Sequence, residues 1–395
     1  MRKIQQTNQQ LIRSGNQMKI LMSLVSQGPA SKAELSRRLA LSKPSIADNV
    51  NPLITQGVLI ESEESDTDPS RGRKPVLLRF NTKYRYVFVI DLSLRTPTLT
   101  LGNIGGMIIS VSSLPLRAEH SFDERFRVLS GAIREQLSTN GISREQLYAI
   151  GISTPGMFFG ESHPTFTNLQ FSSWYEGDLF PRIQEEFSVP IIYMNDADAA
   201  VMGEWYYSWN SGISNLLYVS CGMGLGCGLI LENKLYQNSG KTGSEIFCVV
   251  DRDKYERKTN LENEVNYFSL LRRVKEGIKN GACTCLASMP EPDLNDIILA
   301  FQQKDPFICS LVTYIAEEIA FTIANIVNLL CVDAVVLGGE YLAFDPLYSE
   351  TIRRVLKNVC HYPVCIHDSS LGKSAGIYGL FIMARDRFFQ ECSSI

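Results

Sequence analysis

Short apolar runs that end close to a glycine, a carboxylate or an amide recur along this chain, and they constrain its fold most strongly. These runs occupy residues 86–90, 148–152, 190–194, 216–220 and 335–337. Segments with helical periodicity separate them, and strands that alternate with helices over about 300 residues predict layered α/β structure. The chain of 395 residues is long enough for two or three domains with cores of their own.

The N-terminal residues show a different pattern, that of three short helices. A first apolar face has helical spacing and ends at Gln27-Gly28-Pro29; it consists of Met18, Leu21, Met22 and Val25. Ser31 and Glu34 have the spacing of a capping box, so we expect a second helix from there to about Leu39. Ser42 is a suitable cap for a third helix, with Pro44 in its first turn.

The second and third helices, joined by Ala40-Leu41, predict a helix-turn-helix. The later helix of such a pair enters the DNA major groove by its N-terminal end. Four side chains in or near that end are of types that reach phosphates or base edges: Ser42, Lys43, Ser45 and Asn49. Pro52 lies within this helix, which we therefore expect to end near Val50 or to kink. A three-helix dimerisation module is the alternative.

A basic loop follows the three helices. It lies between strand-like runs at residues 58–60 and 76–80 and holds Arg71, Gly72, Arg73 and Lys74. Helices followed by a β-hairpin form a winged helix, which we expect over residues 1–82. Three cations around a glycine suit the DNA minor groove. A solvated basic linker is the alternative interpretation of the loop.

Charge is divided unevenly between the two ends of the chain. Residues 1–85 hold 14 Lys and Arg against 7 Asp and Glu, a net charge of +7. The remaining 310 residues hold 24 against 35, a net charge of −11. A basic head on an acidic body indicates that only the head meets a polyanion such as DNA.

The sequence favours a cytoplasmic protein without membrane contact. Residues 1–20 are polar and lack the apolar core of a secretory signal. The apolar stretch at 319–337 is interrupted by Asn325, Asn328 and Asp333, which predicts a buried helix running into a strand instead of a membrane span. Ten cysteines without disulfide or metal spacing indicate buried thiols in a reducing compartment.

Several motifs in a fixed order resemble the ROK family of repressors, uncharacterised reading frames and sugar kinases. They are NDADAA at 195–200, the glycine-rich turn at 221–228, GSEI at 243–246 and SSLG at 369–372. The resemblance spans essentially the whole chain and includes the winged helix and the Gly-Arg-Lys-Pro sequence of the repressor branch. It implies a two-lobed, actin-like ATPase fold over residues 83–395. The small lobe would comprise about 83–196 and a C-terminal helix at 374–395, and the large lobe about 197–373.

The resemblance also implies a sugar site between the lobes. Asn195 and Asp196 would hold sugar hydroxyls, and Asp196 matches the general base of kinase relatives. Asn168, Glu245 and Glu262 match further sugar contacts of the family. Carboxylates and amides suit this role because they accept and donate hydrogen bonds to hydroxyls. A solvated surface position is the alternative for each acid.

The family's zinc-binding cysteines are replaced in this chain. Their positions fall on Asp253, Tyr255 and Asn260, so we expect no structural zinc. The family histidine that follows the glutamate motif is Cys248 here, which should alter the sugar pocket. The sequence does not name the sugar, since family members answer to glucose, xylose, N-acetylglucosamine and others.

Both phosphate-binding loops depart from the kinase pattern. Asp91 is followed by Leu-Ser-Leu-Arg where kinase relatives have x-Gly-Gly-Thr, and Met223 replaces the threonine of a Gly-Thr-Gly turn. We therefore expect no enzymatic activity and no cofactor. The resemblance implies a repressor, a homodimer or homotetramer, that binds operator DNA and a sugar or sugar-phosphate effector. The alternatives are an active sugar kinase with an accessory DNA-binding domain and a protein-only scaffold.

Overall fold

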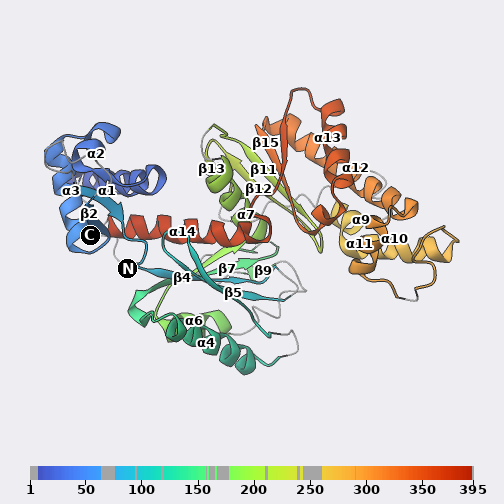
Figure 1. Cartoon of the computed structure of the whole chain (residues 1–395), viewed down its shortest axis with the longest axis horizontal. Helices are drawn as coiled ribbons and strands as arrows, with labels where there is room; N and C mark the ends of the chain where they lie inside the picture. The colour runs from blue at the N-terminus through green and yellow to red at the C-terminus, as the bar shows by residue number, and fades with distance from the viewer. Residues whose placement is uncertain are drawn as a thin grey trace.

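The computed structural model describes most of the chain. The described residues are 8–63, 76–93, 96–116, 120–156, 158–159, 165–166, 178–209, 212–237, 241–242, 260–289 and 291–393. They form an N-terminal head and two lobes, each lobe with its own five-stranded sheet (Figure 1).

The head is a winged helix. Its elements are α1 (Asn8–Gln27), β1 (Ala30–Ser31), α2 (Lys32–Leu39), α3 (Lys43–Thr55), β2 (Leu59–Glu63) and β3 (Val76–Phe80). The strands pair antiparallel in the order β1-β3-β2, so β2 and β3 form the expected hairpin after the three helices. The predicted winged helix-turn-helix is confirmed.

The helix caps are those that the sequence predicted, with one difference. The Ser31 hydroxyl accepts a hydrogen bond from the Glu34 N–H at 3.2 Å, and the Ser42 hydroxyl accepts one from the Ser45 N–H at 3.3 Å. The Glu34 carboxylate does not return to the Ser31 backbone, because it pairs with Arg38 one turn later. Only half of the predicted capping box therefore forms.

The expected end of α3 near Val50 is wrong, since this helix continues through Pro52 to Thr55. Proline removes a single intrahelical hydrogen bond, the one that its own N–H would have donated. The last turn stays closed, because the Gln56 N–H donates to the Pro52 carbonyl at 2.9 Å. Burial of Leu53 in the head core compensates for the lost bond.

The small-lobe sheet has the order β10-β7-β4-β5-β6, with β10, β7 and β4 parallel and the other pairs antiparallel. Its elements are β4 (Tyr86–Asp91), β5 (Thr98–Asn103), β6 (Ile108–Ser113), α4 (Phe122–Thr139), η1 (Arg144–Gln146), β7 (Leu147–Thr154), α6 (Leu179–Phe187) and β10 (Ile191–Asn195).

Strand β4 shows why this sheet carries helices on both faces. Successive side chains of a strand point to opposite faces. Phe88 and Ile90 belong to the core beneath α4 and α6, whereas Val87 and Val89 belong to the core beneath α14 (Ala375–Cys392). All four are buried, and an apolar run without polar alternation is typical of a strand covered on both faces.

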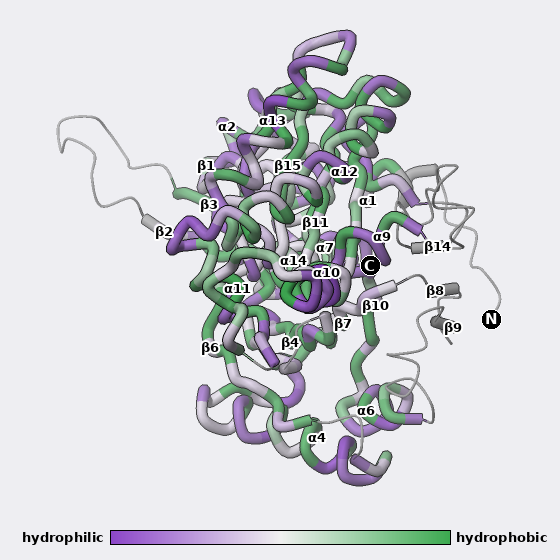
Figure 2. The backbone as a smooth tube through the Cα atoms, turned by 90° about the vertical axis from the view of Figure 1, so that its right-hand side faces the viewer, coloured by the Kyte–Doolittle hydropathy of each residue, from purple (hydrophilic) through white to green (hydrophobic). Residues whose placement is uncertain are grey.

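The large-lobe sheet has the order β13-β12-β11-β15-β16. Its strands are β11 (Leu216–Cys221), β12 (Leu225–Leu231), β13 (Lys234–Leu235), β15 (Ala334–Gly338) and β16 (Cys365–Asp368). The helical elements of the lobe are α9 (Leu261–Val265), α10 (Tyr267–Lys279), α11 (Leu294–Gln302), α12 (Pro306–Leu330), η4 (Glu340–Phe344), α13 (Leu347–Val359) and η5 (Gly372–Ser374). Figure 2 looks along the molecule and shows mixed purple and green segments on the outer helices α4 and α13, as amphipathic helices produce.

The apolar stretch at 319–337 forms the end of α12 followed by β15, as predicted. In length and composition α12 would suit a membrane span, and it is the one described helix with this property. Its buried face is part of the large-lobe core, with Ile315, Ile319, Ile323 and Val327 all enclosed. The apolar character of α12 is thus used in packing.

Two helices connect the three parts of the molecule. Helix α7 (Asp196–Glu204) continues into the π-helix η2 (Trp205–Trp209), and α14 packs along α7. From there α14 runs over the small-lobe sheet to the head, where the C-terminus lies (Figure 1). A further small sheet, β14-β8-β9, pairs β14 (Lys241–Thr242) with β8 (Phe158–Phe159) and β8 with β9 (Thr165–Phe166).

The cysteines match the prediction only in part. The nine that the structure describes are free, but only Cys221, Cys227 and Cys392 are buried. Cys283, Cys285, Cys331 and Cys365 are exposed. The expectation of buried thiols is therefore wrong for most of them, because the spacing of cysteines in the sequence, on which it rested, does not determine their exposure to solvent.

Candidate functional site

The polar residues predicted from the strand ends meet at one edge of the small-lobe sheet. Parallel pairing aligns Asp91 with Ser153 and Asn195 with Thr154, so β4, β7 and β10 end side by side. Because carboxyl ends of parallel strands share an edge, Asp91 and the start of α7 at Asp196 lie close together. This edge of the sheet is the candidate functional site.

Asn195 acts in this structure as the N-cap of α7. Its side-chain oxygen accepts hydrogen bonds from the N–H groups of Ala197 and Asp198 at 2.9 and 3.1 Å. Its side-chain nitrogen donates to the Gly156 carbonyl at 3.0 Å, and only 6% of the residue is exposed. The amide therefore fixes the start of α7, where Asp196 lies, and has little of its own surface left for a ligand.

Asp196 and Asp91 form a pair of interacting acids. Burial, together with the negative charge of Asp91, raises the pKa of Asp196 to about 7, although the Ala197 N–H opposes this shift. Burial also raises the pKa of Asp91, against hydrogen bonds from Ser93 and Ser153 that favour its charged form. The Ser93 hydroxyl and N–H lie 2.6 and 2.9 Å from the Asp91 carboxylate. The two carboxyl groups therefore oppose each other's ionisation.

Glu262 lies in the large lobe, against the glycine-rich turn at 222–224. Its carboxylate accepts a hydrogen bond from the Leu225 N–H at 3.3 Å, and burial raises its pKa. A Cβ atom added to Gly224 would lie 2.9 Å from this carboxylate, so a larger residue at this position would displace the Glu262 side chain. The backbone donor at 225 is therefore already occupied.

Glu340 makes a second contact of the same kind, which sequence reasoning missed. Its carboxylate accepts a hydrogen bond from the Met223 N–H at 2.9 Å, and it would clash with a side chain at Gly222. Parallel pairing of Ser220 with Gly338 sets the turn after β11 beside the residues that follow β15. A carboxylate directly after Gly338-Gly339 was the signal available in the sequence.

Residues 369–371, near the C-terminus, are hydrogen-bonded to the carboxylate of Glu204. Glu204, with 0% exposure, accepts hydrogen bonds from Ser369, Ser370 and the Leu371 N–H at 2.5, 2.9 and 3.0 Å. The Ser208 hydroxyl adds a fourth at 3.2 Å. This buried carboxylate therefore binds the loop that leads into α14, a role that sequence reasoning did not foresee.

The predicted DNA-contact residues of α3 fall into two groups. Ser42 and Lys43 are exposed and Ser45 is half-buried at the N-terminal end of the helix. Asn49 is only 5% exposed; its amide donates to the Ser45 carbonyl at 2.7 Å, and its backbone carbonyl accepts from the Gln17 side chain. The expectation that Asn49 reaches a base edge does not agree with this burial, which arises because its side chain turns back along α3.

The remaining predicted residues are outside the described part of the chain. They are Asn168 and Glu245 of the sugar site, Arg71, Gly72, Arg73 and Lys74 of the basic loop, and Cys248, Asp253 and Tyr255. Asn260 is described and caps α9, accepting a hydrogen bond from the Asn263 N–H at 3.1 Å. Within the described residues no group of His, Cys, Asp and Glu is placed to hold a metal. The absence of structural zinc stays a prediction.

Comparison with curated proteins finds relatives over nearly the full length of the chain. A xylose repressor of Caldicellulosiruptor bescii is 25% identical over 391 residues, which cover 95% of this chain and 96% of that protein. A xylose repressor of Bacillus spizizenii is 26% identical and covers 96% and 97%. A glucokinase of Halalkalibacterium halodurans is 23% identical and covers 65% of this chain and 80% of its own length.

Solved structures show the same fold. A ROK family transcriptional regulator, a homolog of the E. coli MLC protein, has a TM-score of 0.80 at 21% identity and covers 97% of this chain and 99% of its own. A ROK family glucokinase from Streptomyces griseus has a TM-score of 0.61 at 22% identity and covers 76% and 99%. The two lobes therefore have the predicted actin-like fold. The ROK family model matches residues 117–246 and 261–387, which together make up more than half of the sequence and extend over parts of both lobes, and the chain belongs to the ROK family.

Proposed function

We propose that this protein is a sugar-responsive transcriptional repressor. The head would bind operator DNA, and the pocket at Asp196 would bind the sugar effector. The relatives named xylose repressor extend over both the head and the lobes, which makes D-xylose the first effector to test. The Cys248 difference from the family leaves other sugars and sugar phosphates as further candidates.

The observation that supports a repressor over a kinase is that two carboxylates already accept the backbone hydrogen bonds of the glycine-rich turn. Phosphoryl transfer needs free backbone N–H groups and positive charge around the phosphates. Here Glu340 and Glu262 accept the hydrogen bonds of Met223 and Leu225, the donors that flank Gly224. Two carboxylates beside this turn would repel the phosphates of ATP. We therefore propose that the chain has no kinase activity and needs no cofactor.

Sugar binding is proposed for the acids of the small-lobe edge. Asp196 lies in the first turn of α7, close to Asp91, and a carboxylate can accept two hydrogen bonds from vicinal hydroxyls. Without a phosphate-binding loop opposite, Asp196 can bind a sugar hydroxyl, but no phosphoryl donor is held in place for that hydroxyl to attack. Asn168, Glu245 and Glu262 remain proposed as further contacts, and Asn195 as the residue that positions Asp196.

DNA binding is proposed for the first turn of α3 and for the basic loop. Ser42, Lys43 and Ser45 would contact phosphates and base edges in the major groove, while Asn49 is left out because it is buried. Arg71, Gly72, Arg73 and Lys74 would enter the adjacent minor groove. The proposal includes a cytoplasmic location, since operator DNA lies there. It also includes a homodimer or homotetramer, because two heads are needed to read a palindromic operator.

Selection of duplexes from a random library by the purified full-length protein tests the DNA-binding part. We expect enrichment of a palindromic sequence, and release of the selected duplex by D-xylose, D-glucose or N-acetylglucosamine. A parallel assay of ADP release with ATP and the same sugars tests the alternative. Turnover in the common enzyme range of about 1–10³ s⁻¹ would show an active kinase with an accessory head. Failure to prefer any duplex at moderate salt would refute the repressor.

A further inference from the structure

We infer that α14 transmits the state of the effector pocket to the DNA-binding head, as one stiff connection from α7 to the winged helix. This inference rests on the proposed function, because it names how the pocket would regulate the head. It goes beyond that function in identifying the residues that couple the two sites. The packing contacts at both ends of α14 support this inference.

The first end of α14 packs directly on the helix that begins at Asp196. A Cβ atom added to Gly379 would overlap the Ala199 carbonyl, and one added to Gly203 would overlap the Ala375 carbonyl. The two helices therefore touch backbone to backbone, with no side chain between them to absorb a displacement. Such contacts behave as rigid joints because packed backbone has no alternative rotamer to adopt.

A buried carboxylate holds the same two helices together at their other point of contact. Glu204, the last residue of α7, receives hydrogen bonds from Ser369, Ser370 and the Leu371 N–H in the loop before α14. Hydrogen bonds to a buried charge are strong and costly to break. We conclude that α7 and the first turns of α14 move as one body.

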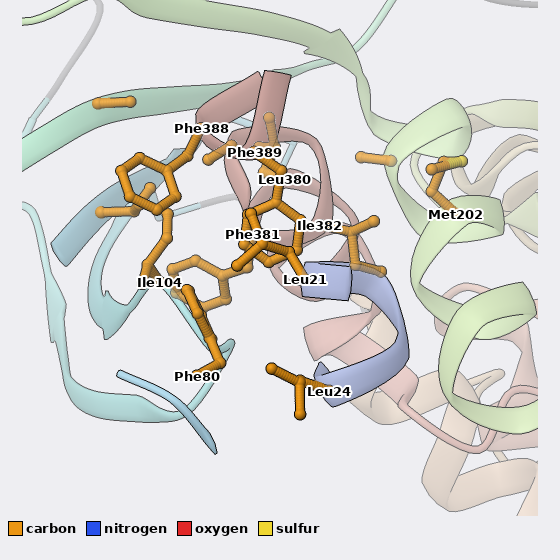
Figure 3. Packing of buried hydrophobic residues seen from close by; sticks show 14 of the residues in the cluster. Leu21, Leu24, Phe80, Ile104, Met202, Leu380, Phe381, Ile382, Phe388 and Phe389 are labelled. Atoms are coloured by element: carbon orange, nitrogen blue, oxygen red, sulfur yellow. The ribbon is translucent and has the colours of Figure 1, made fainter. Parts of the chain in front are cut away.

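The second end of α14 packs against the head. The ring of Phe389 meets that of Phe80 edge to face at 5.1 Å, and the ring of Phe388 lies 6.5 Å from that of Phe80. Phe388 also lies 5.8 Å from the ring of Tyr84, in the segment that follows the head. Leu21 and Leu24 of α1 belong to the same buried cluster (Figure 3). The orientation of the head thus depends on the position of these two phenylalanines.

A third contact shows that the small-lobe sheet supports this junction. The ring of Tyr148 packs edge to face on Phe388 at 5.2 Å, and its hydroxyl donates to the Glu391 carboxylate at 2.9 Å. An α-helix of 18 residues is about 27 Å long, so a tilt of about 5° moves its far end by about 2 Å. Closure of the cleft on a sugar would therefore alter the spacing of two heads on an operator.

The Gly379→Ala substitution tests the connection in the full-length protein without any ligand. The added methyl group should separate α14 from α7 and loosen the head. We expect amide hydrogen exchange to rise roughly tenfold in peptides from 18–25 and 76–80, in addition to those from 196–204. Gly131→Ala in α4 is the matched control, since a Cβ at Gly131 meets no atom within 4 Å. This control should leave head exchange unchanged.

The Phe388→Leu substitution tests the connection from the opposite end and covers the case in which Gly379→Ala does not fold. Coupling is reciprocal, so loosening the head contact should raise exchange in 196–204 as well. Exchange in α4 and α13 should stay at the wild-type value in both variants. If each substitution changes only the peptides that it touches, α14 is not a coupling element and the inference is wrong.

Sugar and DNA measurements separate this inference from the proposed function. With the duplex selected by the wild-type protein, Phe388→Leu should keep D-xylose binding, read as a thermal shift, while release of DNA by D-xylose falls at least fivefold. If D-xylose gives no thermal shift with the wild-type protein, the proposed effector is wrong. The exchange result still decides the coupling in that case, because it needs no ligand.

Discussion

The carboxylate of Glu340 accepts a hydrogen bond from the Met223 N–H at 2.9 Å, within the turn that ROK kinases would use for phosphate. Parallel pairing of β11 and β15 brings the two residues together, and glycine at 222 leaves room for the carboxylate. The contact places a carboxylate at a turn where phosphate binding would require free N–H groups or positive charge. The register of β11 and β15 thus places the carboxylate on this turn.

We expect no measurable binding of ATP to the wild-type protein, because the Glu340 carboxylate occupies the Met223 N–H. Glu340→Gln keeps an oxygen acceptor for the Met223 N–H and removes the charge, so the fold should survive. We expect no thermal shift with millimolar ATP for the wild type and a small positive shift for Glu340→Gln. Glu350→Gln, on the exposed first turn of α13, is the control and should behave as the wild type. An equal ATP shift for wild type and variant would remove the role assigned to Glu340.

Stability should depend on pH through Asp196. Its folded-state pKa of about 7 lies above the unfolded value of 3.8, so the folded protein holds the proton more tightly. Stability from this group is therefore greatest at low pH and is lost as pH rises from about 4 through 7. Asp196→Asn should remove this pH-dependent loss of stability. The variant's free energy of unfolding should exceed that of the wild type by roughly 2–4 kcal/mol at pH 8 and equal it near pH 4. Denaturant unfolding at several pH values measures the difference, and a gain independent of pH would contradict it.

Asp196→Ala should separate the two proposed activities. The residue lies in the pocket and does not contact the head, so affinity for the selected duplex should change less than twofold. Release of that duplex by sugar should be lost, because the pocket loses its principal hydroxyl acceptor. Fluorescence anisotropy with and without D-xylose measures both quantities. A variant that still releases DNA at the wild-type sugar concentration would place the effector elsewhere.

Arg71→Ala combined with Arg73→Ala should weaken DNA binding and reduce its salt dependence. Each lost phosphate contact lowers the slope of log affinity against log salt by about 1, so the double variant should lose about 2. Lys357→Ala on the exposed face of α13 is the control for a change of charge far from the head. Unchanged affinity and slope in the double variant would support the solvated-linker interpretation of the basic loop.

Glu204→Ala should destabilise the protein strongly. The substitution leaves the half-buried Ser369, the exposed Ser370 and the Leu371 N–H without the acceptor that the buried Glu204 provides. The expected cost is about 3–5 kcal/mol. Glu350→Ala, an exposed acid, should cost less than about 0.5 kcal/mol. Thermal unfolding of both variants measures the contrast, and similar melting temperatures would show that the Glu204 cluster does not hold the loop.

Local features of the head could be predicted because they depend on near neighbours in sequence. Ser31 and Ser42 cap helices as expected, since a cap needs only the N–H groups two or three residues later. The burial of Asn49 could not be predicted, for the opposite reason. Whether a side chain on α3 faces DNA or the core depends on where α1 packs, and Gln17 of α1 contacts the backbone of Asn49.

The sequence by itself determined the elements, their order and the family, and it placed Asp91 and Asp196 at strand ends, because strand periodicity and turn residues are local properties. Only the tertiary structure decided which residues the buried and turn-facing carboxylates contact. The contact of Glu340 with Met223 depends on the register of β11 and β15, and that of Glu204 with Ser369 depends on the packing of α7 and α14. Such contacts join residues more than 100 positions apart, and no local pattern encodes them.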